Sequence, residues 1–230
     1  MTLETIQHHI ADIKQRLSGT PDFGPEMNVE VWGNQVHIYH HKFPKTSATI
    51  DMDNNTIIAT SGSRLEDSRQ DLKEIINCHQ GGLLRNSTYI IDGGAFRFYT
   101  DAYGRVRRAV ARLSSELNIQ HGGRPKYSSD RDKLAIDEYS HIIGCSLMGP
   151  QEKINIVYLH WNTNRELMRP LETFLSAPSR SKGHYRLTLN IRINYPVSSS
   201  RPESIEYWAE MQSSEASGTF KYTFQNPSGQ

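Results

Sequence analysis

Short runs in which apolar and polar residues alternate predict that most of this chain forms β-strands. Near the N-terminus, Gly33-Asn34 and residues 53–55 each separate two such runs, as the turn of a β-hairpin does. Further strand-like runs follow along the chain, separated by glycine-rich or polar turns. The predicted strands are 28–32, 35–41, 47–52, 56–60, 87–91, 95–100, 105–113, 154–159, 185–195, 204–211 and 219–224.

Apolar residues at three-to-four residue spacing predict a smaller number of helices. Residues 3–17 and about 63–77 have this spacing, and a third helix is predicted to begin near residues 162–164. The order of elements predicts the α+β class. We expect a small N-terminal α+β domain over residues 1–90, whose role the sequence does not indicate. A second domain, over residues 95–230, is expected to place antiparallel strands around one central helix.

The composition is that of a soluble globular protein and excludes several other classes. The chain has 230 residues, of which 36% are hydrophobic, and no apolar run reaches the roughly 20 residues that a membrane span needs. The N-terminus lacks the basic and apolar regions of a secretory signal peptide. Two cysteines, Cys78 and Cys145, do not make a disulfide framework. We expect synthesis in the cytoplasm, with secretion or delivery by a signal-independent route left open.

The charge is distributed unevenly along the chain. Residues 1–96 carry 8 Lys and Arg against 12 Asp and Glu, whereas residues 97–230 carry 18 against 13. A basic C-terminal half suits a polyanionic partner, because electrostatic attraction supplies most non-specific affinity for nucleic acid. An excess of this size also arises by chance, so the charge supports nucleic-acid binding only together with other features.

The candidate chemistry is concentrated in residues 137–172. His141, Asn155, Asn164 and Glu172 come from a predicted hairpin and the first turns of the following helix. A neutral histidine can activate water as a general base. Amide and carboxylate oxygens suit a hard cation such as Mg²⁺, and we expect Asn164 and Glu172 to lie near one helical face. Taken singly, each of these residues is more often structural, as a core histidine, a helix cap or a solvated glutamate.

These residues resemble the DNA/RNA non-specific endonucleases, the ββα-metal or His-Me finger family, over residues 95–226. The family's Asp-Arg-Gly-His motif, Asp-Gly-Gly-His in its branch of secreted bacterial effector toxins, falls on residues 138–141. Its Asn-(x)8-Asn-(x)7-Glu core falls on Asn155, Asn164 and Glu172 with both spacings kept. The flanking runs FYTDAYGRVRRAVARL, MGPQEKINIV and SSSRPESIEYWAEM are similar to family segments.

The resemblance implies a ββα-metal fold, His141 as the general base, and Asn164 as a ligand of Mg²⁺ or Mn²⁺. Glu172 would bind the metal or orient its waters, and Asn155 would support the site. The motif arginine is replaced here by Tyr139. Candidates for contact with substrate phosphates are Tyr139, Arg165, Arg169, Arg105 and Arg108, and the arginines are also the candidates for stabilising the transition state.

The sequence therefore predicts a metal-dependent, sequence-non-specific endonuclease that cuts DNA, with RNA as a further substrate. An antibacterial effector role would add an immunity protein as a partner, and no membrane is expected to be involved. The alternative is a degenerate nuclease fold that binds nucleic acid or a protein without cutting. Cys145 is expected to be a small buried residue. Trp161 and Trp208 are expected in the core, with the alternative that Trp161, beside the helix start, stacks on a base.

Overall fold

The computed structural model describes residues 27–33, 35–40, 43–51, 53–54, 56–59, 83, 85–117, 132–180, 184–214 and 217–228. The helices predicted at 3–17 and 63–77 lie outside these residues. Within them, the predicted strands are present and most differ from the sequence-based bounds by only one or two residues.

The N-terminal strands are β1 (Met27–Trp32), β2 (Gln35–His40), β3 (Phe43–Asp51) and β4 (Thr56–Ala59). They are followed by β5 (Thr88–Ile91), β6 (Phe96–Thr100), β7 (Val106–Ser114), β8 (Asp137–His141), β9 (Ile156–His160), β10 (Tyr185–Asn194), β11 (Ser204–Ser213) and β12 (Ser217–Gln225). Helical turns lie at Asp92–Gly94, Cys145–Leu147, Lys153–Asn155, Thr163–Met168 and Ala177–Arg180, and helix α3 spans Arg169–Ser176.

Ten of the strands form one sheet, in the order β1-β2-β3-β4-β5-β6-β7-β10-β11-β12. Neighbouring strands are antiparallel except β4 and β5, which pair in parallel. The four N-terminal strands thus continue the sheet of the C-terminal half. Strands β8 and β9 form a separate antiparallel hairpin. The described fold is therefore mostly antiparallel sheet with one short α-helix.

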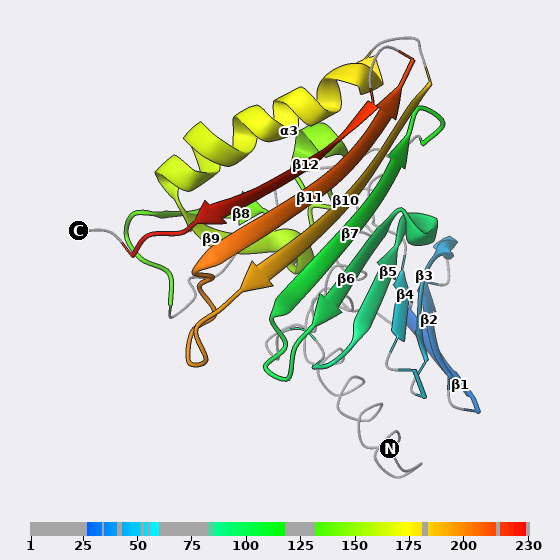
Figure 1. Cartoon of the computed structure of the whole chain (residues 1–230). Coiled ribbons are helices and arrows are strands. Elements are labelled where there is room, and N and C mark those ends of the chain that lie inside the picture. The colour runs from blue at the N-terminus through cyan, green and yellow to red at the C-terminus, as the bar shows by residue number, and fades with distance from the viewer. Residues whose placement is uncertain are drawn as a thin grey trace.

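Helix α3 and the β8–β9 hairpin lie on the same side of the large sheet (Figure 1). Buried residues of strand β10 alternate with exposed or half-buried ones, so one face of the strand is apolar. That apolar face is the one that the helix and the hairpin cover. Leu187, Leu189, Ile191 and Ile193 all point into the core. The same core contains Ile142, Ile143, Leu159 and Leu175 of the hairpin, its loop and the helix. Burying both layers together fixes the hairpin against the sheet.

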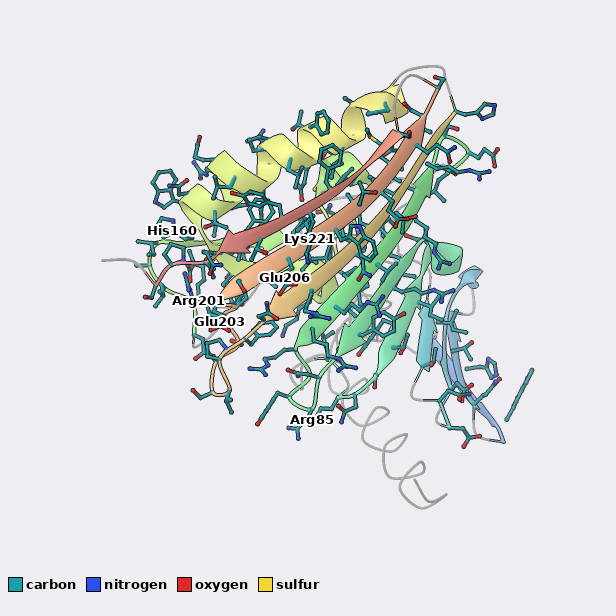
Figure 2. All side chains as sticks on the ribbon, in the orientation of Figure 1. Arg85, His160, Arg201, Glu203, Glu206 and Lys221 are labelled. Atoms are coloured by element: carbon teal, nitrogen blue, oxygen red, sulfur yellow. The ribbon has the colours of Figure 1, made fainter. Side chains whose placement is uncertain are left out.

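A buried ion pair joins the hairpin to the loop before β11. Arg201 donates from Nε and Nη2 to the two carboxylate oxygens of Asp137, each at 2.8 Å. The guanidinium also donates to the backbone oxygens of Asn226 and Pro227. Figure 2 shows Arg201 near His160, whose backbone N–H donates to the Asn226 side chain. The start of β8, the end of β9 and the C-terminal segment therefore meet at this arginine.

Two predictions about tryptophan were wrong. Trp161 and Trp208 are each 46% exposed rather than in the core. Trp208 belongs to the outward-facing set of β11, since its neighbours Tyr207 and Ala209 are the buried ones. No helix in the described ranges has the length and apolar character needed to cross a membrane.

Candidate active site

His141 is the last residue of β8, and the loop after it is held in place by Asn155. The amide nitrogen of Asn155 donates to the backbone oxygens of Ile143 and Pro150, each at 2.8 Å. Its Oδ1 accepts from the Ile143 N–H at 2.9 Å. The Asn155 side chain is fully buried. It therefore shapes the loop from inside, and His141 depends on it for position.

The His141 imidazole is half-buried and lies beside Gln151 and Cys145. Its Nε2 is 3.2 Å from Gln151 Oε1. Cys145 Sγ lies 3.7 Å from Nε2 and 3.9 Å from Nδ1. The Gln151 side chain is only 7% exposed and donates its amide N–H to Cys145 Sγ at 3.0 Å. These three side chains form one contiguous cluster, which we call the His141 cluster.

The cluster alters the acidity of both titratable groups. Burial acts to lower the pKa of His141, but the net shift is upward, because Cys145 and Gln151 hydrogen-bond to the ring and Glu172 adds negative charge. The hydrogen bond with His141 lowers the pKa of the Cys145 thiol to about 7, against the opposing effect of burial. Cys145 is exposed, so the prediction of a small buried residue was wrong.

Glu172 reaches the same loop from helix α3. Its carboxyl lies against the Gly144 N–H and the Tyr207 hydroxyl, both of which favour its ionised form, and that hydroxyl donates to the Ile142 backbone oxygen. A Cβ atom at residue 144 would collide with this carboxyl, so only glycine permits the close approach. Burial raises the pKa of Glu172 to about 7, although the nearby positive charge of His141 acts to lower it. Glu172 thus packs against the loop that follows His141.

Asn164 lies in a second cluster, on a wide helical turn. Residues Thr163–Met168 form a π-helical segment, a feature frequently found at functional sites. Asn164 Oδ1 accepts from Ser140 Oγ at 2.7 Å, and its Nδ2 donates to Glu138 Oε2 at 3.0 Å. Arg165 forms an ion pair with the same Glu138. We call these four residues the Asn164 cluster.

The structure therefore divides the predicted site between two neighbouring clusters. His141 and Glu172 belong to one, and Asn164 belongs to the other. Ser140 and His141 are consecutive at the end of β8, so the two clusters adjoin along the chain at this point. Among the described residues, no direct hydrogen bond joins Asn164 to His141 or Glu172.

Arg105 is enclosed by its own surroundings. Its guanidinium bonds to Asp101, at 2.8 Å from Nε to Oδ2, and to the backbone oxygens of Pro196 and Ser199. The same group lies 4.7 Å from the ring centroids of Tyr103 and Tyr195. Arg105 therefore joins the turn between β6 and β7 to the loop between β10 and β11.

The other predicted phosphate contacts are more accessible. Arg165 and Arg169 are exposed on the helical segment after β9. Tyr139 is exposed on β8, with Lys133 Nζ 5.6 Å from its ring centroid. Arg108 lies on β7, where it bonds to Asn190 at 3.0 Å. Arg165, Arg169 and Tyr139 belong to the hairpin and its following helix, whereas Arg108 belongs to the large sheet.

Sequence reasoning missed Gln151 and the partnership of Glu138 with Asn164. Gln151 follows a Gly-Pro turn ten residues after His141, and nothing in its spacing indicates that the chain returns to the imidazole there. Glu138 enters the sequence prediction only as the first position of the motif at residues 138–141. Its hydrogen bond from Arg165 is the largest cause of a lowered pKa, so the carboxylate stays ionised.

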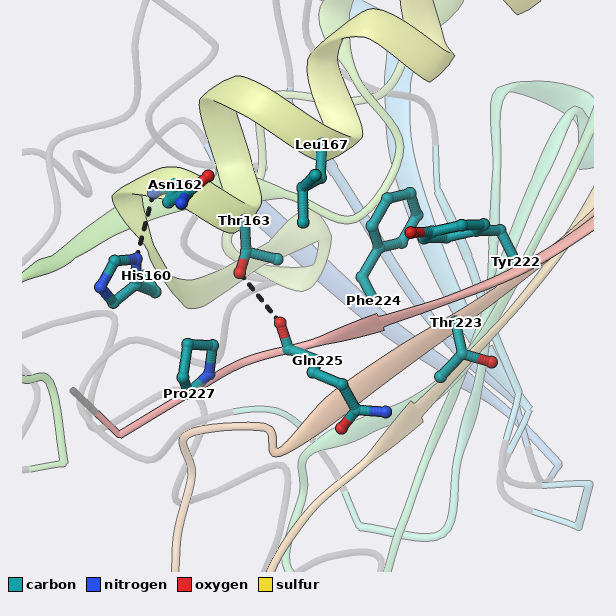
Figure 3. A pocket seen from close by; sticks show the side chains of 9 residues that line it. All are labelled: His160, Asn162, Thr163, Leu167, Tyr222, Thr223, Phe224, Gln225 and Pro227. Atoms are coloured by element: carbon teal, nitrogen blue, oxygen red, sulfur yellow. Dashed lines mark hydrogen bonds between the residues drawn. The ribbon is translucent and has the colours of Figure 1, made fainter. Parts of the chain in front are cut away.

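A pocket of about 280 Å³ lies beside the site, between the start of the helical segment and β12. Figure 3 shows Leu167, Tyr222 and Phe224 lining it, with Thr163 Oγ1 donating to the Gln225 backbone oxygen at 2.9 Å. Its lining residues include none from either cluster. Its lining residues Asn162 and Thr163 precede Asn164 in the chain, but the His141 imidazole does not line the pocket.

The Asn164 cluster offers oxygen donors of the kind that Mg²⁺ takes. The Asn164 carbonyl oxygen accepts from Ser140, and the Asn164 amide nitrogen donates to the Glu138 carboxylate, which is ion-paired with the exposed Arg165. Within the described ranges, no three His, Cys, Asp or Glu side chains converge on one metal position. A Mg²⁺ ion keeps several waters and needs only one or two protein oxygens, so these residues fit such an ion.

Comparison with known proteins assigns the chain to a family. The profile of the DNA/RNA non-specific endonucleases matches residues 85–213, which include every residue of both clusters. The chain belongs to the DNA/RNA non-specific endonuclease family. The resemblance carried by residues 137–172 is thereby confirmed. The hydrogen-bonded clusters of this endonuclease-family chain are therefore its candidate active site.

A solved structure of an "extracellular endonuclease" is similar to this endonuclease-family chain, with 13% sequence identity and a TM-score of 0.41. The match covers 66% of this chain and 86% of the other. No significant match to a curated protein was found.

Proposed function

We propose that this chain is a Mg²⁺- or Mn²⁺-dependent endonuclease that hydrolyses DNA without sequence specificity, and RNA as a further substrate. The observation that carries the proposal is the His141 imidazole, held at the end of β8 by Gln151 within a family-matched segment. Phosphodiester hydrolysis needs a base near neutral pH, and a histidine with one oriented ring nitrogen supplies it.

The contacts of Gln151 support a particular orientation of the imidazole. The Gln151 amide N–H faces two acceptors, Cys145 Sγ at 3.0 Å and the Gly149 backbone oxygen at 3.5 Å. Its Oε1 therefore faces His141 Nε2 and accepts a hydrogen bond from the N–H there. That leaves the lone pair on Nδ1 to take the proton of the attacking water.

Asn164 would hold the metal ion through its carbonyl oxygen, with the Glu138 carboxylate beside it. When bound, the ion would supply positive charge to the phosphate oxygens and to the leaving 3′-oxygen. Glu172, expected as a second ligand, is given a positioning role, because its half-buried side chain lies against Gly144 and Tyr207. Arg165, Arg169 and Lys133 would hold backbone phosphates near the hairpin.

We also propose that the natural target is the nucleic acid of other bacterial cells. The support is the resemblance of residues 137–172 and their flanking runs to the toxin branch of the family, in which His141 keeps the motif histidine. A producing cell would then need an immunity protein that covers the site.

The direct test is digestion of supercoiled plasmid by the full chain. We expect conversion to nicked and then short products with Mg²⁺ or Mn²⁺, none in EDTA, and weaker cutting as salt rises. Heat-denatured protein is the control for a contaminating nuclease that survives heating. Intact plasmid with both metals, across protein concentrations that give stable binding, would instead establish the non-cutting alternative.

Cleavage is expected to increase with pH, with a midpoint above 6.5. The reason is that the net pKa of His141 is raised above its ordinary value of 6.5, and only the neutral imidazole accepts a proton. Cys145→Ser removes the main raising contribution, so the midpoint should move to lower pH. Initial rates in Mg²⁺ from pH 5 to 9 measure both profiles. A flat wild-type profile would contradict His141 as the base.

A further inference from the structure

Cys145 is a nucleophile that the proposed hydrolysis does not use. Its thiol is exposed, yet it is not an isolated surface cysteine. Sγ lies within 4 Å of both ring nitrogens of His141 and accepts the buried Gln151 amide N–H at 3.0 Å. Two separate elements, the end of β8 and the turn after Pro150, therefore bring a base and a hydrogen-bond donor to one thiol.

This arrangement makes the thiol reactive. Thiolate, not thiol, attacks disulfides and other soft electrophiles, and a neighbouring imidazole and a donated N–H both stabilise thiolate. The lowered pKa of Cys145, about 7, agrees with this geometry. Exposure of the side chain lets a small reagent reach it.

We propose that Cys145 is a modification site for small disulfides, and that the adduct switches off the site by covering His141. In the step, the thiol proton passes to the imidazole and the Cys145 sulfur attacks one sulfur of the reagent. A new S–S bond forms, the reagent's S–S bond breaks, and its second half leaves as a thiolate. A dithiol reductant reverses the exchange.

The block follows from the position of Sγ beside the imidazole. A group attached there occupies the space next to Nδ1, where the attacking water must lie. Modification at Cys145 stands without the nuclease assignment, whereas loss of cutting rests on the proposed function. The two parts are measured separately.

The modification is tested on the folded full chain with 5,5′-dithiobis(2-nitrobenzoate) at pH 7. Cys145 and Cys78 fall in different tryptic peptides, residues 134–153 and 74–85, so mass spectrometry follows each thiol. We expect Cys145 of wild type to react roughly fivefold faster than Cys145 of His141→Gln. Its lower pKa gives a larger fraction of thiolate at pH 7, and the lower intrinsic nucleophilicity of that thiolate offsets part of the gain. Gln151→Met, checked for native circular dichroism, should slow it too. Equal rates in all three proteins would overturn the proposal.

The switch is tested by cutting after labelling. Wild type labelled at Cys145 should lose roughly 90% or more of its Mg²⁺-dependent activity. Dithiothreitol should restore that activity, because it reduces the mixed disulfide by thiol–disulfide exchange. Cys145→Ser is compared only with itself: its Mg²⁺-dependent rate, whatever its size, should be the same before and after treatment with the reagent. Full labelling with unchanged cutting would reject the switch. If unlabelled wild type does not cut, the nuclease assignment fails, and the labelling rates still decide whether Cys145 is a modification site.

Discussion

Replacing His141 with alanine is expected to lower the Mg²⁺-dependent cleavage rate by about 10²–10⁴-fold. Proton transfer from water to a positioned base contributes this much to hydrolysis, and no second imidazole lies in the His141 cluster as described. The metal and phosphate contacts assigned to Asn164, Arg165 and Arg169 remain in the variant. Substrate binding should therefore change much less than the rate.

The measurement is the initial rate of plasmid nicking, together with DNA affinity in EDTA. His184→Ala is the matched control, since His184 is exposed just before β10 and away from both clusters. Added imidazole should restore part of the activity of His141→Ala, because a diffusible base can enter the vacated space. An alanine variant that cuts as fast as wild type would remove His141 from the mechanism.

Replacing Arg201 with alanine is expected to lower the free energy of unfolding by about 3–5 kcal/mol. The variant leaves the fully buried Asp137 carboxylate without its cation, and it removes the donors of the Asn226 and Pro227 backbone oxygens. The pair joins β8 to the loop before β11. Its loss should therefore loosen the hairpin that carries His141.

Urea unfolding monitored by tryptophan fluorescence measures the change. Arg186→Ala, at an exposed position of β10, should change the unfolding free energy by no more than about 0.5 kcal/mol. The double variant Asp137→Leu, Arg201→Met should recover part of the loss, since it removes both charges together. A loss below about 1 kcal/mol in Arg201→Ala would show that water or other groups replace the arginine.

The sequence alone determined the start of the helix, the family and the strands other than β8, which carries His141 and was not among the predicted alternating runs. Alternation in β10 and β11 is a local property, because successive side chains of a strand face opposite sides. The hairpin turns at Gly33 and at residues 53–55 are local as well. The candidate site residues all lie within one hairpin and the helix that follows it. Their spacing along the chain can therefore be compared directly with the family motif, as for His141, Asn155, Asn164 and Glu172. These features need no knowledge of distant contacts.

Only the tertiary structure decided how those residues are grouped. Gln151 returns to His141 through a loop whose shape depends on the buried Asn155 amide. The sequence predicted Glu172 beside Asn164. In the structure the half-buried Glu172 carboxyl lies instead against Gly144, in the loop that follows His141.

The pattern of apolar and polar residues also did not predict the long-range contacts. Asp137 and Arg201 are 64 positions apart, and their pairing depends on where the hairpin meets the sheet. Exposure of Cys145 and Trp208 also depends on which face the second layer covers, and an apolar residue type does not specify that face. Local periodicity therefore determines the elements, whereas packing between layers determines which side chains share a site.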